Sequence, residues 1–399
     1  MTLDKAIELT VAKNKVNNKI PLLLQSSNNE IEKYKKQNLP TVTWNTQFSI
    51  QSENISLDLP IPGIDPIDLP LYKAQSTLDA NYVVYDGGVS KTLIENEKIK
   101  AKISEQSINV QLYNLKDKVV EIYYNIILAD RQKEVLDSSL SILHTKKEVM
   151  NSMYSNGVIM KSDIDKIDIE IIKTEQNIAN IISGKKTLLN VLSNLTGIEE
   201  NTIVVNEPEA IGNIDNTDWT NRPELNLFEL KNELLDHSNK IIDLKNKPKV
   251  ALFAKAGVGY PNPLNFFDTS FSPFAIGGVN VIWNIWDWKR TKIDKQKIQI
   301  EKDLVDNDKD IFDENIKLES DKLASQISGL KENAKFDNKI IENQKQIITT
   351  VENQYKNGVA TISDYLTELS KKNISEINKA IHDIELEKTQ YKLNILLNK

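Results

Sequence analysis

The chain has 399 residues, of which 40% are hydrophobic and 27% are charged, and it contains no cysteine. Without cysteine, disulfides and thiolate metal sites are excluded. Fifty basic residues against 57 acidic ones give a formal charge of −7, which argues against a nucleic-acid-binding protein because such proteins carry a basic face. No run of about 18 apolar residues occurs, so no transmembrane helix is predicted. Few glycines and prolines favour long helices with narrow apolar stripes.

The first residues, Met-Thr-Leu-Asp-Lys-Ala, enter a helical pattern directly, without the basic and apolar segments of a secretory signal. Read alone, this start indicates a cytoplasmic protein. A mature or trimmed chain would begin in the same way, so the location of the protein has to be inferred from the later elements.

Two short helices are predicted first, over 3–19 and 21–37, with Pro21 at a first helical position, where proline is favoured. After Pro40, apolar residues alternate with polar ones, which is the period of a strand with one apolar face. This strand is placed at about 40–52, and its return strand at about 75–86. A proline-rich loop over 53–73 joins the two strands and is expected to be solvated surface.

Long helices are predicted next, because no proline occurs in 71–207 or in 274–399 and proline breaks helix interiors. A helix over 89–153 is followed by a shorter helix over 162–196. The pair Asn156-Gly157 marks the turn between them, since glycine takes the left-handed conformation at helix ends. In the shorter helix, apolar residues recur at alternating steps of three and four, which indicates coiled-coil packing.

The second half of the chain repeats the first. The motif Tyr-x-Asn-Gly-Val-x-x-x-Ser-Asp begins at Tyr154 and again at Tyr355, 201 residues later, and at the same offset Tyr85 corresponds to Trp286. Two matches in register predict an internal duplication, with repeats over 1–207 and 208–399. The elements predicted in the second repeat are helices over 222–246, 288–354 and 362–398, strands over about 248–260 and 274–286, and a preceding polar linker over 198–221.

Each predicted strand has about 10 to 12 residues, the length of a tilted strand that crosses a bilayer with apolar residues toward lipid and polar residues toward the lumen. Four strands cannot close a barrel, and an open edge in lipid is costly, so several chains would have to contribute; three chains give 12 strands. Two half-buried hairpins in a soluble α+β protein are the alternative, which helices of about 65 residues disfavour because they are too long to fold over the hairpins. The residues predicted to face lipid are Val42, Trp44, Phe48, Ile50, Val281 and Trp283.

The pattern as a whole resembles the TolC-type outer-membrane efflux proteins, the outer membrane factors. The resemblance covers nearly the whole chain, and it depends on the order and spacing of motifs that are individually weak. The residues that carry it are Leu3-Asp4-Lys5-Ala6-Ile7, the Asn-x-Pro entries at Pro40 and Pro248, Tyr85-Asp86-Gly87-Gly88, Arg222-Pro223-Glu224-Leu225, and the Tyr-x-x-Gly turns with Ser162-Asp163 and Ser363-Asp364.

The resemblance implies a mainly α fold with a small β part, in which three chains form a 12-stranded transmembrane β-barrel that continues as a 12-helix coiled-coil α-barrel. It implies a homotrimeric channel in the bacterial outer membrane, in contact with its lipid and reaching into the periplasm. Such a channel is a passive conduit for small molecules or proteins in a tripartite efflux or type I secretion system. Its partners would be a periplasmic adaptor protein and an inner-membrane pump. The missing signal segment is then expected to be a truncation.

No cofactor, metal or enzymatic activity is expected. The three histidines, His144, His237 and His382, each lack a ligand partner three or four residues away, and Gly257-Val258-Gly259 lies within a predicted strand rather than before a helix. Two other functions stay open: a soluble periplasmic coiled-coil scaffold that binds proteins, and a secreted pore-forming toxin.

Acidic residues follow each helix turn. Ser162 with Asp165, and Thr361 with Asp364, match the capping box at a helix start. The resemblance adds a second role, because acidic residues at this turn line the closed periplasmic mouth of the channel. Thr367 stands where a second acid of this kind is expected. The residues expected at the channel entrance are Asp364 and Asp163, and those expected at the periplasmic tips, in contact with the adaptor, are Tyr154, Asn156, Gly157, Tyr355, Asn357 and Gly358.

Overall fold

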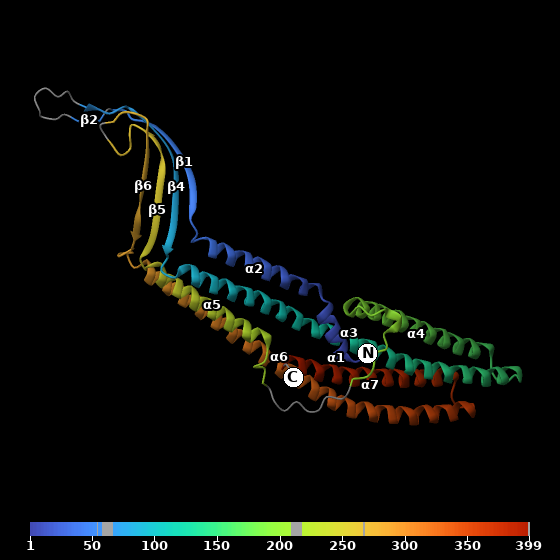
Figure 1. Cartoon of the computed structure of the whole chain (residues 1–399). Helices are drawn as coiled ribbons and strands as arrows, with labels where there is room; N and C mark the ends of the chain where they lie inside the picture. Colours follow the sequence, from blue (N-terminus) through green and yellow to red (C-terminus); the bar gives the residue numbers. More distant parts are fainter. Residues whose placement is uncertain (54, 58–66, 209–217, 266–267, 398–399) are drawn as a thin grey trace, which may run out of the picture. The chain divides into compact units, whose positions relative to one another are not determined.

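The computed structural model describes the chain except residues 54, 58–66, 209–217, 266–267 and 398–399. The backbone divides into two compact units, and each of them draws segments from both halves of the sequence (Figure 1). The first unit comprises Met1–Ile20, Gln106–Asn226 and Asp308–Lys399, and the second comprises Pro21–Glu105 and Leu227–Asn307.

A four-stranded antiparallel sheet of order β1-β4-β5-β6 belongs to the second unit. The alternation of apolar and polar residues produces these strands, and the two hairpins, far apart in the sequence, join through β4 and β5. Among the described residues, β1 and β6 each pair on one side only. The strands are β1 (Thr41–Ile50), β4 (Tyr72–Tyr85), β5 (Lys249–Tyr260) and β6 (Ser272–Ile282).

The segment predicted as the loop 53–73 lies partly outside the described residues. Its described part contains a short hairpin in which β2 (Ser56–Leu57) pairs with β3 (Ile67–Asp68). The strand expected over 274–286 is shorter than predicted, because β6 ends at Ile282. Trp283 therefore lies after the strand, where its indole Nε1 donates a hydrogen bond to the carbonyl oxygen of Asn246 at 3.1 Å.

Helices α2 (Lys19–Lys36) and α5 (Pro223–Lys245) lie largely in the second unit, with the first parts of the long helices α3 and α6. Pro223 is the first residue of α5, one residue after the predicted start, whereas α2 begins at Lys19 and has Pro21 at its third position. The pair α2 and α3 packs through the buried Ser27, whose hydroxyl donates to the Glu97 carbonyl oxygen at 3.3 Å.

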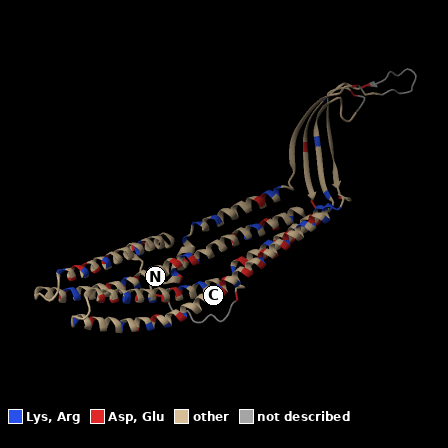
Figure 2. Ribbon diagram, turned by 180° about the vertical axis from the view of Figure 1, so that it is seen from behind, with Lys and Arg blue, Asp and Glu red and all other residues tan. Residues whose placement is uncertain are grey.

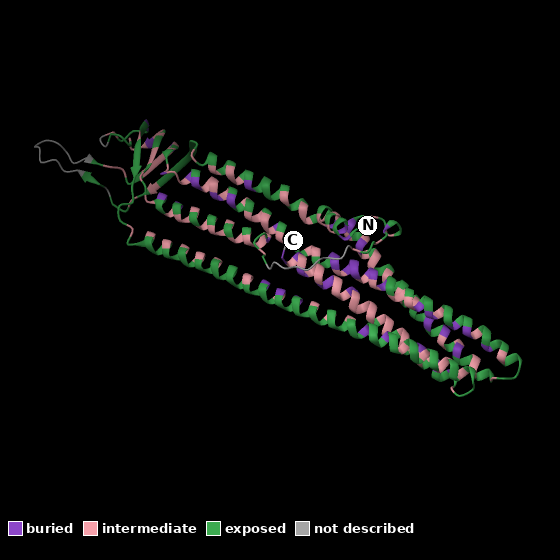
Figure 3. Cartoon of the chain, turned by 90° about the horizontal axis from the view of Figure 1, so that it is seen from below, coloured by how far each residue is buried: buried purple, intermediate pink, exposed green. Residues whose placement is uncertain are grey.

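In the first unit, helices α1 (Leu3–Lys13), α4 (Lys161–Thr196) and α7 (Ile362–Leu396) pack with the remainder of α3 (Val89–Ser155) and α6 (Arg290–Lys356). The long helices have 67 residues each, two more than predicted for α3. The buried side chains follow narrow stripes along the helices (Figure 3), as the low hydrophobic fraction predicts.

Two large apolar clusters and a smaller one, formed by Leu323, Leu393 and Leu397, lie in the described part of the first unit. One centres on Tyr123 and Tyr124 of α3 and includes Leu3 of α1, Leu192 of α4 and Ile384 of α7. It also takes in the buried Ile203, so the segment predicted as a polar linker over 198–221 packs against the helices where it begins; part of that segment lies outside the described residues. The other cluster lies next to the helix turns and comprises Leu143, Met150, Ile167, Ile171, Ile362, Tyr365 and Leu369.

The heptad pattern predicted for α4 is confirmed, since Ile167, Ile171, Thr174 and Leu192 are buried on one stripe. In the part of the chain that the structure describes, no helix is long and apolar enough to cross a membrane.

Candidate functional site: the helix turns and the sheet faces

The two helix turns, α3 to α4 and α6 to α7, share one set of backbone hydrogen bonds. In the first turn, the Gly157 N–H donates to the Tyr154 carbonyl oxygen at 2.9 Å, and the Val158 N–H donates to that of Met153 at 2.9 Å. Gly157 has φ of +75°, the left-handed conformation that ends a helix and that glycine adopts without strain. The Asn156 side-chain amide donates to the Ser152 carbonyl oxygen at 2.9 Å.

The second turn repeats this geometry. Gly358 has φ of +73°, its N–H donates to the Tyr355 carbonyl oxygen at 3.0 Å, and the Asn357 side-chain amide donates to the Asn353 carbonyl oxygen at 2.9 Å. The repeated Asn-Gly pair thus builds two helix ends of the same design.

The helix starts after these turns differ in their capping. At the start of α7, the Asp364 N–H donates to the Thr361 hydroxyl at 3.2 Å, and the Thr361 N–H donates to Asp364 Oδ2 at 2.8 Å, so the predicted capping box is confirmed. At the start of α4, the capping residue is Met160, whose N–H donates to Asp163 Oδ2 at 3.3 Å. The box predicted from Ser162 and Asp165 is wrong by two residues, because α4 begins at Lys161.

Asp364 is the more exposed of the two predicted mouth acids. It has no ion pair among the described residues, and the Thr361 hydroxyl and N–H hold the pKa of its carboxylate below the ordinary value. Asp163 is three-quarters buried and lies 3.2 Å from Lys166 Nζ, which neutralises part of its charge. Of these two acids, Asp364 therefore keeps the freer charge.

Thr367, which stands in place of a second acid, turns its hydroxyl back to the Ser363 carbonyl oxygen at 2.7 Å. The adjacent Glu368 accepts a hydrogen bond from Gln344 at 2.7 Å and pairs with Lys371 at 2.8 Å. Glu368 is thus held between α6 and α7 and does not extend the acidic group.

The two tyrosines of the repeated motif have different surroundings. Tyr154 is exposed, whereas Tyr355 packs in the apolar cluster next to the turns and its hydroxyl is buried without a hydrogen-bond partner. Burial, together with the negative charge of Asp163 nearby, raises the pKa of Tyr355. The structure therefore brings residues of both turns together, and of the two tyrosines Tyr154 has the exposed ring.

A buried lysine links the helices at these turns, and sequence reasoning missed it. Lys146 of α3 is 8% exposed, its Nζ lies 2.9 Å from Glu352 Oε1 of α6 and 4.4 Å from the centre of the Tyr365 ring of α7. This contact keeps the pKa of Glu352 below its ordinary value. The sequence offered one signal for this contact. Lys146 lies between Leu143 and Met150, at a position where a heptad seam normally has an apolar residue.

The register of the sheet separates two faces. Even-numbered residues of β1, β4 and β5 lie opposite one another, and those of β5 lie opposite odd-numbered residues of β6. We call the face with even-numbered residues of β1 the apolar face; it carries no charged residue in these strands. The strand residues predicted to face lipid share it: Val42, Trp44, Phe48, Ile50 and Val281.

Several polar groups on the apolar face are paired with one another. The Ser76 hydroxyl accepts a hydrogen bond from the Trp44 indole at 2.9 Å and lies 3.0 Å from the Thr46 hydroxyl. At the end of the sheet next to β2 and β3, the rings of Tyr72 and Tyr260 stack with their centres 5.1 Å apart. An uncharged face with several paired polar groups and a stacked pair of aromatic rings at one end is compatible with contact with a bilayer.

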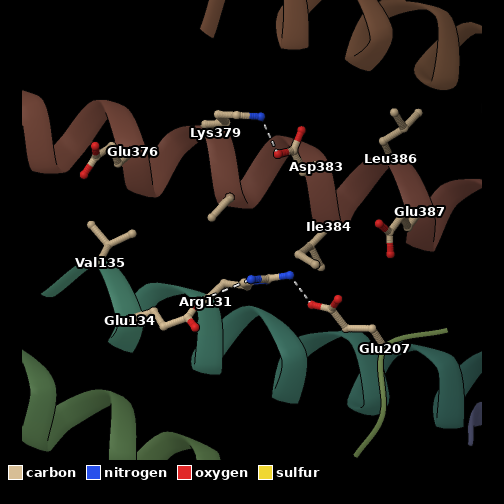
Figure 4. Close-up of a pocket in the computed structure, with 11 residues that line it drawn as sticks. Arg131, Glu134, Val135, Glu207, Glu376, Lys379, Asp383, Ile384, Leu386 and Glu387 are labelled. Atoms are coloured by element: carbon tan, nitrogen blue, oxygen red, sulfur yellow. Dashed lines mark hydrogen bonds and ion pairs between the residues drawn. The ribbon is translucent and has the colours of Figure 1, made fainter. Parts of the chain in front are cut away.

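A hollow of about 530 Å³ lies between α3, α7 and the segment at Glu207 (Figure 4). Its charges are largely paired with one another: Arg131 pairs with Glu207 and, at 3.2 Å, with Glu134, while Lys379 pairs with Asp383 at 2.7 Å. Burial, with the charges of Glu207 and Asp383, raises the pKa of Glu387 at its edge. The hollow is thus lined by ion pairs, and its described lining residues include no nucleophile with a neighbouring base.

Two of the three histidines contact acidic side chains of neighbouring helices. His382 of α7 pairs with the buried Asp337 of α6 at 2.7 Å, and His237 lies 3.8 Å from Glu95. Within the described ranges, no group of three or more histidine or acidic side chains could hold a metal ion.

No family model matches the sequence, and no curated protein sequence matches it. Solved structures do match, over 99% of this chain. The outer membrane protein VceC of Vibrio cholerae is 13% identical, with a TM-score of 0.69 over 95% of its own chain. The CmeC outer membrane channel of Campylobacter jejuni is 13% identical, with a TM-score of 0.67 over 85% of its chain. The MtrE outer membrane channel of Neisseria gonorrhoeae is 14% identical, with a TM-score of 0.68 over 88% of its chain.

These structures are those of outer-membrane proteins, two of them channels, and none is described as an enzyme. At such low identity the match concerns the fold. It agrees with the order of motifs in the sequence, from the first helix to the second turn. The chain therefore has the fold of the TolC-type outer-membrane channels.

Proposed function

We propose that this chain is a bacterial outer-membrane channel of the TolC type, which spans the outer membrane and reaches into the periplasm. The observation that supports this most is the sheet, whose apolar face is free of charge and whose two edge strands each lack one partner in the part of the chain that the structure describes. In lipid, unpaired strand edges are costly, so such a sheet requires closure into a barrel.

Closure requires further copies of the chain. The strands alternate in direction from β1 to β6, so β6 of one copy can pair with β1 of the next in the same antiparallel manner. Three copies give 12 strands, an even number within the range of outer-membrane barrels. The helices of three copies would continue the barrel as a tunnel of 12 helices. In each copy, the two repeats over 1–207 and 208–399 would each supply half of that copy's helices in the tunnel.

The turns at Gly157 and Gly358 would form the periplasmic tips, six in a trimer, and would contact an adaptor protein. The channel itself would be passive, with transport driven by an inner-membrane pump in an efflux or type I secretion system. Exposed Tyr154 and the exposed apolar residues Val158 and Val359 support a docking role for the tips.

Membrane insertion and conductance test this function together. The protein, produced with a secretion signal in a Gram-negative host, is expected in the outer-membrane fraction, and the detergent-purified protein should give discrete conductance steps in planar bilayers. Recovery as an elongated monomer in buffer without detergent, and no conductance, would favour the soluble coiled-coil scaffold instead.

The acidic residues at the turns should determine cation selectivity and block by multivalent cations. We expect Asp364→Ala to reduce cation selectivity and block by multivalent cations, and Asp163→Ala to do so less, because Lys166 already neutralises part of the Asp163 charge. Thr361→Val is the matched control, since it removes the helix cap but keeps the Asp364 charge. Equal selectivity and cation block in wild type and the double aspartate variant would leave both residues as helix caps.

A further inference from the structure

The charged residues of the four long strands all lie on one face of the sheet. These strands contain four charged residues, Lys73, Asp79, Lys249 and Lys255, and every one of them is odd-numbered in β4 or β5. By the register, these positions lie on the face opposite Val42 and Trp44. We call it the charged face; Figure 2 shows how few charges the strands carry compared with the helices.

Two of these charges oppose each other in the middle of the sheet. Asp79 of β4 and Lys255 of β5 are directly paired in the register, and both are half-buried. Residues directly opposite on neighbouring strands have side chains about 5 Å apart at Cβ, so their charges compensate locally. Asp79 Oδ1 is buried and accepts no hydrogen bond among the described residues, and Asp79 forms no ion pair with Lys255 there, so the compensation rests on their opposed positions alone.

The other two charges have no acidic residue opposite them in the sheet. Lys73 is paired in the register with Ser49, near the end of the sheet next to β2 and β3, and Lys249 is paired with Ile282 at the helix end. Three lysines and one aspartate leave a charge of +2 per chain on the charged face, whereas the whole chain carries −7. The sheet therefore has the opposite sign to the rest of the molecule.

We propose that the charged face lines the barrel lumen as a positively charged wall that favours small anionic solutes. This inference rests on the proposed function, because it requires the barrel. In a trimer, Lys73 and Lys249 form one ring of three positive charges near each end of the lumen, and the Asp79–Lys255 pairs form a neutral ring between them. Low-dielectric walls concentrate the field of such rings and raise the local concentration of counter-ions.

The ratio of chloride to potassium permeability, measured from the reversal potential in a KCl gradient across a planar bilayer, tests this proposal. We expect the double variant Lys73→Met, Lys249→Met to lower the ratio several-fold, and Asp79→Asn to raise it. Thr43→Val is the neutral control on the same face and should leave the ratio unchanged. The double variant Lys73→Arg, Lys249→Arg keeps the charge and should keep the ratio, which separates loss of charge from altered folding.

An unchanged ratio in the methionine variant, or a shift in the same direction in the methionine and Asp79→Asn variants, would overturn the positively charged wall while leaving the channel function standing. Absence of any conductance in the wild-type protein would instead overturn the channel function and this inference with it.

Discussion

Single residues decide how the long helices end. At both turns, glycine supplies a positive φ in open space, because nothing lies within 4 Å of the position that a Cβ would take at Gly157 or Gly358. A larger side chain would therefore be penalised by the backbone alone, without any steric clash. At these turns, the effect of backbone strain on stability can therefore be measured separately from the effect of side-chain packing.

We expect Gly358→Val to destabilise the protein by about 1–2 kcal/mol, the cost of the left-handed conformation for a residue with a Cβ. Gly184→Ala, in the middle of α4 and equally free of neighbours, should instead stabilise it by about 0.5–1 kcal/mol, because alanine is the better helix former. Denaturant unfolding in detergent measures both. Equal stability of the two variants would contradict this account of the turns.

Glu387, which lies next to the ion pairs around Arg131, makes the free energy of unfolding depend on pH. The pKa of Glu387 is raised in the folded protein, so the folded state binds more protons than the unfolded state between the ordinary and the raised pKa, and stability falls as pH rises through that window. Glu387→Gln should remove this loss and stabilise the protein at pH 7 by about 0.5 kcal/mol.

Thermal unfolding at pH 4 and pH 7 checks the sign, since the stabilisation by Glu387→Gln should be present at pH 7 and absent at pH 4. Glu385→Gln is the contrasting variant, because Glu385 pairs with Lys388 at 2.5 Å and its loss should destabilise. Stabilisation at pH 4 and not at pH 7 would reverse the proposed sign.

Helices and strands follow from local periods, and for this reason the sequence predicts most of them. The heptad steps of α4, the alternation in β1 and β5 and the Asn-Gly turns are local signals, and the structure has these elements within about two residues of the predicted ends. Other ends differ by more: α1 ends at Lys13 rather than at residue 19, and β4 begins at Tyr72 rather than at about 75. β6 ends at Ile282, although apolar residues continue to Ile285.

What local periods do not contain is the pairing between distant segments. The adjacency of β4 and β5 joins strands about 170 residues apart in sequence, and the contact between Lys146 and Glu352 joins two helices. Neither leaves a local pattern, apart from a lysine at a seam position. The acidic pair at the mouth was predicted from a resemblance, and the structure adds the unequal exposure of its members.

The alternation of the strands makes a sharp prediction about their two faces. Arginine at Val42 or Trp44, on the apolar face, should block membrane assembly, since a charge near the bilayer midplane costs about 2–4 kcal/mol on the lipid side of a barrel. Arginine at Thr43 or Asn45, on the charged face, should assemble and alter only conductance. Outer-membrane fractionation of the four variants measures this, and equal tolerance on both faces would remove the argument for a barrel.

At the level of the whole molecule, the fold and the sheet support one proposal: a chain that becomes a channel when three copies close a barrel. That assembly would give a role to three features of the sheet. These are the apolar face, the charged face, and the edge strands β1 and β6, which pair on one side only among the described residues. The likeness to VceC, CmeC and MtrE extends over 99% of the chain and concerns its fold.

The number of chains per particle tests the central claim most directly. Light scattering of the detergent-purified protein, with the detergent mass subtracted, should give three times the chain mass of 45.4 kDa, or about 136 kDa, and cross-linking should stop at three chains. A monomer or dimer that stays folded in buffer without detergent would contradict the account, because the edges of β1 and β6 would then need no partner from another copy.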